Sequence, residues 1–292
     1  MSPVPRETRH FTAAQGLRLA ADCFGDPGHP PVLFFHGGGQ TRHAWGGTAK
    51  ALAEEGWYAV SFDLRGHGDS DWSDAGNYYF QDYGADATAL ASQFDPPPVL
   101  VGASLGGIAS LWAVARAKES PLAAGLVLVD IATRMEHTGA ERIRQFMTSR
   151  PEGFASLEEA ADAISEFNPH RKRSKDLSGL AKNLRLHEDG RYRWHWDPRF
   201  MKTRDLSRAH GELQSLDAAA RELSLPVLLI RGRMSDLLSE EGARHFLALV
   251  PHACFADVSG AGHMVAGDRN DAFTQAVARF LSEEIRGQAG SA

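Results

Sequence analysis

The sequence predicts an α/β fold in which helices cover both faces of a mostly parallel sheet, with a long helical segment inserted between two strands. Short apolar, β-branched runs alternate with segments of helical composition along most of the 292 residues. This alternation stops between residues 134 and 221, where no convincing buried strand is found. A stretch of roughly ninety residues is too long for a loop, so it reads as an inserted unit.

The predicted elements follow one another in a regular order. A β-hairpin spans residues 11–24 and turns at Gln15-Gly16. Strands at 32–35, 58–62, 99–101 and 125–129 alternate with helices that cover 49–55, 82–94 and the stretch after Ser104. Beyond the insertion lie strands at 226–230 and 253–258 and a closing helix at 271–285. Binding sites in such sheets lie beyond the carboxyl ends of the strands, so residues there are the candidates for function.

One serine occupies a favourable place in this pattern. Ser104 lies in Gly102-Ala103-Ser104-Leu105-Gly106, between a predicted buried strand and a predicted helix. A serine on a tight strand-to-helix turn, with a glycine two residues away on either side, has the context of a nucleophile elbow. The alternative is an ordinary Gly-Ser turn, so the assignment depends on whether partners for Ser104 exist at other strand ends.

Such partners are present. A serine hydroxyl needs a base that takes its proton, and the base needs a third group that orients it. His263, in Gly262-His263, follows the last predicted strand and is the candidate base. Two aspartates compete as the acid: Asp236 follows the strand at 226–230, and Asp130 ends the strand at 125–129. The chain order Ser, Asp, His fits both; we favour Asp236, because its loop is expected to lie between the strand next to the nucleophile's neighbour and the histidine loop.

A glycine-rich segment is the candidate oxyanion hole. His36-Gly37-Gly38-Gly39 directly follows the strand at 32–35, and its glycines leave backbone N–H groups unobstructed. We expect the N–H groups of Gly38 and Leu105 to bind the developing negative charge of an acyl intermediate. Asp63, Arg65 and His67 follow another strand, and we expect them to form a buried, hydrogen-bonded turn that supports this segment.

Composition excludes several classes of function. A net charge of −6 favours neither nucleic acid nor a membrane surface, and the chain shows no signal-peptide core or membrane-spanning run. The residues carry no metal-ligand spacing, so neither a metal nor a cofactor is expected, and Cys23 and Cys254 are predicted to be free thiols. A small-molecule substrate and a cytoplasmic location follow as expectations. Trp194, Trp196 and Met135 in the insertion either line the substrate cavity or pack the insertion against the sheet.

Together these motifs resemble the α/β-hydrolase superfamily, specifically the branch that carries a helical cap. The resemblance runs from about residue 11 to 285 and rests on the His36 loop, the Asp63–Ser70 turn, the Ser104 elbow, the Asp236 loop and Gly262-His263. It implies an eight-stranded, mostly parallel sheet, with a core of residues 1–132 and 222–286 and a cap of about residues 133–221 inserted after the sixth strand. In epoxide hydrolases and haloalkane dehalogenases of this branch the nucleophile is aspartate, so Ser104 argues against both.

The resemblance implies a serine hydrolase that cleaves a small to medium carboxylic ester through an acyl-enzyme. Lactone hydrolysis, C–C bond hydrolysis and cofactor-free perhydrolysis are alternatives on the same three residues. A non-catalytic protein that uses the fold as a ligand pocket is a remote alternative.

Overall fold

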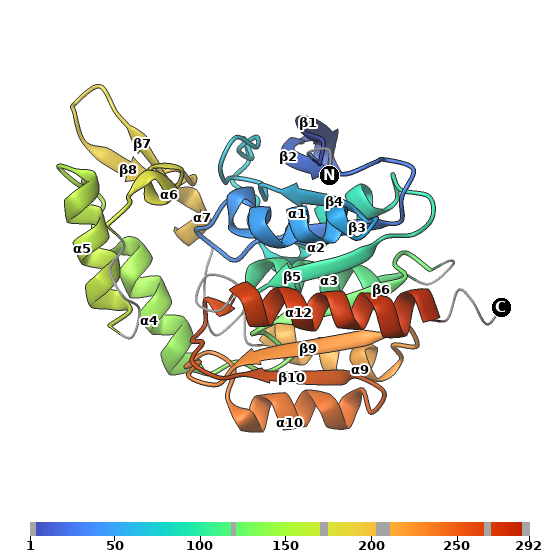
Figure 1. The fold of residues 1–292 in the computed structure, drawn as a ribbon. Coiled ribbons are helices and arrows are strands. Elements are labelled where there is room, and N and C mark those ends of the chain that lie inside the picture. Colours follow the sequence, from blue (N-terminus) through green and yellow to red (C-terminus); the bar gives the residue numbers. More distant parts are fainter. Residues whose placement is uncertain (1–3, 118–120, 170–174, 203–210, 266–269, 288–292) are drawn as a thin grey trace.

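An eight-stranded sheet forms the centre of the molecule (Figure 1). The computed structural model describes residues 4–117, 121–169, 175–202, 211–265 and 270–287. The strand order is β1-β2-β4-β3-β5-β6-β9-β10; β1 and β4 pair antiparallel with β2, and all other neighbours are parallel. The predicted mostly parallel sheet is confirmed. Its strands are β1 (Arg6–Thr12), β2 (Arg18–Phe24), β3 (Pro31–Phe35), β4 (Tyr58–Phe62), β5 (Val99–Ala103), β6 (Gly125–Val129), β9 (Val227–Gly232) and β10 (Cys254–Val258).

Helices cover both faces of the sheet, and each face has its own apolar core. On one face α1 (Gly46–Glu54) packs against α12 (Asn270–Phe280). On the other face four helices pack in sequence: α2 (Phe80–Ala91), α3 (Leu105–Arg116), α9 (Leu216–Arg221) and α10 (Glu240–Leu249). The central strands β3, β4, β5 and β6 are buried almost throughout, which explains their continuous apolar runs in the sequence. Short helical turns are η1 (Ala14–Gly16), η2 (Arg42–Trp45) and η3 (Leu281–Arg286).

The insertion between β6 and β9 lies beside the sheet (Figure 1). It holds α4 (His137–Thr148), α5 (Leu157–Phe167), α6 (Ser178–Ala181) and α7 (Arg199–Lys202). The sequence predicts helices here, but the insertion also holds an antiparallel hairpin of β7 (Leu184–Leu186) and β8 (Tyr192–Trp194). Each of these strands has three residues and most of them are partly exposed, so no buried apolar run marks them. Helix α9 falls within the expected limits of the cap, yet it packs against α3 and α10.

Two glycines allow α3 to pass close to the sheet. A Cβ atom on Gly106 would lie 2.2 Å from the carbonyl oxygen of Phe35, and one on Gly102 would lie 2.3 Å from that of Gly106. Backbone atoms cannot yield at such distances, so only glycine fits either position. This close approach brings the first turn of α3 beside the loop that follows β3.

Cys23 and Cys254 are both free cysteines, as expected. Within the described ranges, no helix combines the length and the apolar composition that crossing a membrane requires.

Candidate active site

Ser104 lies at the junction of β5 and α3 in a strained backbone conformation. Its φ is +46° and its ψ is −112°, a region that non-glycine residues rarely adopt. The Ser104 N–H donates to the carbonyl oxygen of Val129, 3.1 Å away, which ties the turn to the end of β6. The side chain is only half-buried. The elbow geometry predicted from the glycine spacing is therefore present.

The structure places Asp130, and not Asp236, against His263. His263 Nδ1 lies 2.7 Å from Asp130 Oδ2, and the Asp130 side chain is fully buried. Asp236 is instead 41% exposed and forms an ion pair with Arg142 of α4 at 2.8 Å. The expectation that Asp236 contacts the histidine is thus wrong. Its loop does follow β9, next to β6, but the loop turns Ser235 inward and Asp236 outward toward the insertion.

Three donors hold the Asp130 carboxylate. Oδ1 accepts from the Gly232 N–H at 3.0 Å, and Oδ2 accepts from both His263 and the Ser235 hydroxyl. The Ser235 Oγ itself accepts from the N–H groups of Leu237 and Leu238 at 3.1 and 3.3 Å, so its one proton is directed at Asp130. Ser235 is not among the residues predicted from the sequence, where only its position one residue before Asp236 points to it.

The loop that carries His263 also contacts the loop after β3. Gln40 Nε2 donates to the sulfur of Met264 at 3.0 Å. This contact joins the loops that follow β3 and β10, which are distant in the strand order. His263 and the glycine-rich segment are thereby held over the same edge of the sheet.

Hydrogen bonds fix the peptide units of the glycine-rich segment. The Gly37 N–H donates to Gln40 Oε1 at 2.9 Å, and the Gly37 carbonyl accepts from the Gln40 N–H and from His36 Nδ1. The Gly39 N–H donates to His67 Nε2 at 3.1 Å. By contrast, among the described residues no acceptor faces the N–H of Gly38 or that of Leu105, the first residue of α3. These are the two N–H groups that the sequence predicts to form the oxyanion hole, and that role stays a prediction.

Two buried histidines support this segment. His36 Nε2 accepts from the Leu64 N–H at 3.0 Å, and burial lowers the pKa of His36, so the ring is neutral. His67 joins Gly39 to the Arg65 carbonyl oxygen, in line with the supporting turn predicted for residues 63–70. Arg65 itself faces the opposite way, since it binds both carboxylate oxygens of Asp86 in α2 at 2.5 and 2.6 Å.

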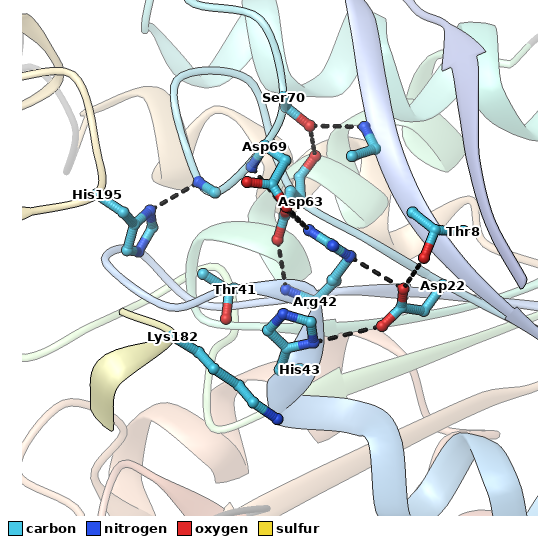
Figure 2. Close-up of polar contacts among 12 residues, drawn as sticks. Thr8, Asp22, Thr41, Arg42, His43, Asp63, Asp69, Ser70, Lys182 and His195 are labelled. Atoms are coloured by element: carbon cyan, nitrogen blue, oxygen red, sulfur yellow. Dashed lines mark hydrogen bonds and ion pairs between the residues drawn. The ribbon is translucent and has the colours of Figure 1, made fainter. Parts of the chain in front are cut away.

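Arg42, in η2, is joined to β2 and to the loop after β4 through a charged network (Figure 2). Its guanidinium contacts Asp63, Asp22 at 3.2 Å and Asp69 at 2.8 Å. Burial alone would lower the pKa of Arg42, but these carboxylates outweigh it and raise that pKa. Arg185 of the insertion binds the other oxygen of Asp69 at 2.8 Å, so the network reaches the insertion.

The aromatic residues expected at the substrate cavity pack tightly. Trp196 is only 6% exposed and stacks on Trp194, with ring centroids 4.9 Å apart. A Cβ atom on Gly39 would lie 3.0 Å from the Trp196 ring, so this ring covers the glycine-rich segment. Met135 is partly buried against the main core. The packing role is observed for all three, and substrate contact stays a prediction.

The sequence has a short run of basic residues at 170–175, for which a solvated surface is the prediction, and of this run only Lys175 lies within the described residues. Within those that are described, no group of three or more histidine, cysteine, aspartate or glutamate side chains is arranged to hold a metal ion.

Comparison with known proteins agrees with this architecture. The family model described as "alpha/beta hydrolase fold" matches residues 30–269. Over 259 residues the chain is 28% identical to the esterase Rv0045c of Mycobacterium tuberculosis, covering 86% of this chain and 83% of that one. It is 27% identical to a 3-hydroxybutyrate-oligomer hydrolase of Cupriavidus necator, over 84% and 87% of the two chains.

Solved structures show the same fold. E-2-(acetamidomethylene)succinate hydrolase superposes with a TM-score of 0.82 over 95% of this chain and 100% of that chain, at 22% identity. An α/β hydrolase from Novosphingobium aromaticivorans gives a TM-score of 0.76 over 97% and 99%, at 25% identity. The fold, the family model and the relatives agree: this chain belongs to the α/β-hydrolase family.

Proposed function

We propose that this protein hydrolyses small to medium carboxylic esters through an acyl-enzyme on Ser104. The observation that carries the proposal is the contact of buried Asp130 with His263, at the same sheet edge as the strained Ser104 turn. The names of the two relatives, an esterase and a hydrolase of hydroxybutyrate oligomers, support ester bonds as the target.

In the proposed reaction, Asp130 replaces Asp236 as the acid. The Nδ1–H group of His263 donates a hydrogen bond to Asp130, which leaves Nε2 as the base. His263 Nε2 takes the proton of Ser104 as Oγ bonds to the ester carbonyl carbon. The N–H groups of Gly38 and Leu105 then donate to the negatively charged oxygen.

Collapse of this intermediate breaks the bond to the alcohol, which leaves with the proton that His263 carries. Water then attacks the acyl-enzyme, again giving its proton to His263, and the acid is released as Ser104 regains a proton. The helix dipole of α3 adds partial positive charge at Leu105, where the oxyanion forms. The reaction thus consumes one ester and one water and returns Ser104 and His263 to their starting forms.

Labelling and turnover test the nucleophile. We expect a fluorophosphonate probe to label Ser104 and p-nitrophenyl acetate and butyrate to be hydrolysed. Ser104→Ala should abolish labelling and lower kcat by at least about a thousandfold, because the residual rate comes from binding and the oxyanion hole alone. Hydrolysis by Ser104→Ala near the wild-type rate would overturn the proposal. A wild-type protein that neither labels nor turns over would favour the ligand-binding alternative.

A matched pair of substitutions tests the acid. Asp130→Asn keeps the shape of the side chain but removes the charge that orients His263, so kcat should fall by about 10³- to 10⁴-fold. Asp236→Asn breaks only a surface ion pair with Arg142 and should leave kcat within about twofold. Loss of activity in Asp236→Asn alone would show that the loop rearranges on substrate binding and that Asp130 is not the acid.

A substrate panel tests the bond type. Trp196 packs on Gly39, and Phe200 lies 3.2 Å from where a Cβ atom of Gly38 would be, so the insertion crowds the proposed oxyanion hole. We therefore expect a preference for short to medium acyl esters over long emulsified lipids. Lactones and vinylogous diketones in the same panel separate lactone and C–C bond hydrolysis from ester hydrolysis; a clear preference for either would replace the ester assignment.

A further inference from the structure

His195 of the insertion reaches the glycine-rich segment, and the proposed reaction does not use it. This residue lies between β8 and α7 and is only 3% exposed. Its Nδ1 lies 2.7 Å from the Gly68 backbone nitrogen, and its Nε2 lies 3.3 Å from the carbonyl oxygen of Gly39. Figure 2 shows the first of these contacts, to the loop that also carries Asp69 and Ser70.

The two contacts fix the proton on the ring. A backbone N–H only donates, so Nδ1 accepts from Gly68 and carries no proton. Nε2 therefore holds the proton and donates it to Gly39. Burial lowers the pKa of His195 to about 4, which keeps the ring neutral and this tautomer occupied near neutral pH. The charged and titratable groups around the ring are His36, Asp63, Arg185 and His67.

From Gly39 the hydrogen bonds continue through two peptide units. The Gly39 carbonyl shares its peptide unit with the Gln40 N–H, and that N–H donates to the Gly37 carbonyl at 3.1 Å. The Gly37 carbonyl in turn shares its peptide unit with the N–H of Gly38. That N–H is one of the two free donors of the proposed oxyanion hole. A single chain of hydrogen bonds thus runs from the His195 ring to the Gly38 N–H.

We propose that His195 is a positioning residue for the oxyanion hole, acting on the Gly38 N–H through the Gly39–Gln40 and Gly37–Gly38 peptide units. The inference rests on the proposed function of Gly38. Consecutive hydrogen bonds in a buried site polarise one another, so the bond from Nε2 strengthens the final donor as well as orienting it. In this way a residue of the insertion acts on a site whose proposed catalytic groups lie in loops at the strand ends and at the start of α3.

Further contacts hold His195 in place. The backbone N–H of Asp197 donates to the Gly66 carbonyl at 2.9 Å, and its carboxylate accepts from the Tyr78 hydroxyl at 2.6 Å. Asn183, which precedes β7, accepts from the Thr41 hydroxyl at 3.2 Å. These contacts join the insertion to the loop after β3 and to the loop after β4, the same two loops that His195 contacts. The His195 ring therefore has little freedom to move.

Two substitutions distinguish the roles of the two ring nitrogens of His195. The amide of glutamine reaches the place of Nε2 and can still donate to Gly39, whereas the amide of asparagine reaches only the place of Nδ1 and can still accept from Gly68. We expect His195→Asn to lower kcat for a p-nitrophenyl ester about tenfold or more, with KM changed less than about threefold. His195→Gln should retain kcat within about threefold of the wild type.

Binding of a phenylboronic acid, measured by calorimetry, gives a readout without turnover. The boronate adduct on Ser104 places a negative charge in the oxyanion hole, so its affinity should fall in His195→Asn by the same factor as kcat and persist in His195→Gln. If no ester were hydrolysed by the wild type, the proposed function would fail, while this titration would still report on His195.

His252→Asn is the matched control. His252 Nε2 also bonds a backbone carbonyl, that of Leu225 at 3.0 Å, but on an exposed surface that is not part of the site. This variant should keep kcat and boronate affinity at wild-type values. Equal kcat in His195→Asn and wild type, or equal losses in His195→Asn and His195→Gln with boronate affinity unchanged, would overturn the inference and leave His195 a packing residue.

Discussion

At the residue scale, the Asp130 carboxylate is a buried charge whose stability depends on its donors. Burying a carboxylate is costly unless hydrogen bonds replace the lost water, and Gly232, Ser235 and His263 supply these bonds. The charged side chains of the loop after β9 pair with other elements instead, Asp236 with Arg142 of α4 and Arg233 with Asp257 of β10. The Ser235 hydroxyl is therefore the donor whose removal changes Asp130 most directly.

We predict that Ser235→Ala lowers kcat for a p-nitrophenyl ester about tenfold. Without the Ser235 hydroxyl, the Asp130 carboxylate loses one of its three donors and holds His263 in place less firmly. A charged hydrogen bond of about 1.5 kcal/mol corresponds to about tenfold in rate. Steady-state kinetics with the wild type and the variant measure the change.

Ser239→Ala is the control for this prediction. The Ser239 hydroxyl accepts from the Gly242 N–H as the N-cap of α10 and does not contact Asp130. Its removal should cost about 1 kcal/mol of stability and leave kcat within about twofold of the wild type. A Ser235→Ala protein that is destabilised but keeps the wild-type kcat would show that Ser235 only shapes its loop.

The two candidate aspartates show how far the sequence alone can go at this scale. Ser104, His263 and Gly38 lie in local patterns whose spacing reveals the turn that each occupies. Asp130 and Asp236 are the same residue type, each just beyond a strand, so chain order and strand position cannot separate them. Which of the two contacts His263 depends on the direction of the side chain within its loop. For Asp236 that direction depends on α4, whose Arg142 holds the side chain outward.

At the element scale, the junction of β5 and α3 relies on close contact between backbones. We predict that Gly106→Ala destabilises the protein by about 2 kcal/mol or more, because its Cβ atom would lie 2.2 Å from the Phe35 carbonyl oxygen and force α3 away from β3. The displacement would also move Leu105, so kcat should fall with stability. Urea unfolding and ester hydrolysis measure both effects.

Gly179→Ala is the matched control, since no atom lies within 4 Å of the added methyl group and the residue is exposed in α6. There alanine should be neutral or slightly stabilising. If both variants unfolded at the same urea concentration, the backbone contact at Gly106 would be looser than the structure shows.

Whether a strand can be predicted from the sequence depends on how deeply it is buried. The strands β3, β4, β5, β6, β9 and β10 were expected because burial on both faces gives apolar runs, or because glycine and proline bound them. Strands β7 and β8 are short and partly exposed, and their pairing depends on contacts such as that between Phe154 and Tyr192. No periodic pattern of apolar residues in the sequence predicts such pairing.

At the scale of the whole molecule, the insertion joins the sheet domain through buried polar contacts whose strength depends on pH. His195 is neutral in the folded protein, and burial lowers its pKa from 6.5 to about 4. In the unfolded chain the same ring takes up a proton near pH 6.5. Lowering the pH from 6.5 toward 4 therefore stabilises the unfolded chain relative to the folded protein.

We predict that the wild type loses more stability than His195→Gln when the pH falls from 7.5 to 5. The linkage relation gives a difference of about 2 kcal/mol over this interval for one histidine with these two pKa values. His36 has its pKa lowered in the same direction, but it is present in both proteins and cancels in the comparison. Urea unfolding of both proteins at the two pH values measures the difference. If both lost stability in parallel, His195 would be protonated as readily when folded as when unfolded, and the neutral ring bridging Gly68 and Gly39 would not be the form that holds the insertion in place.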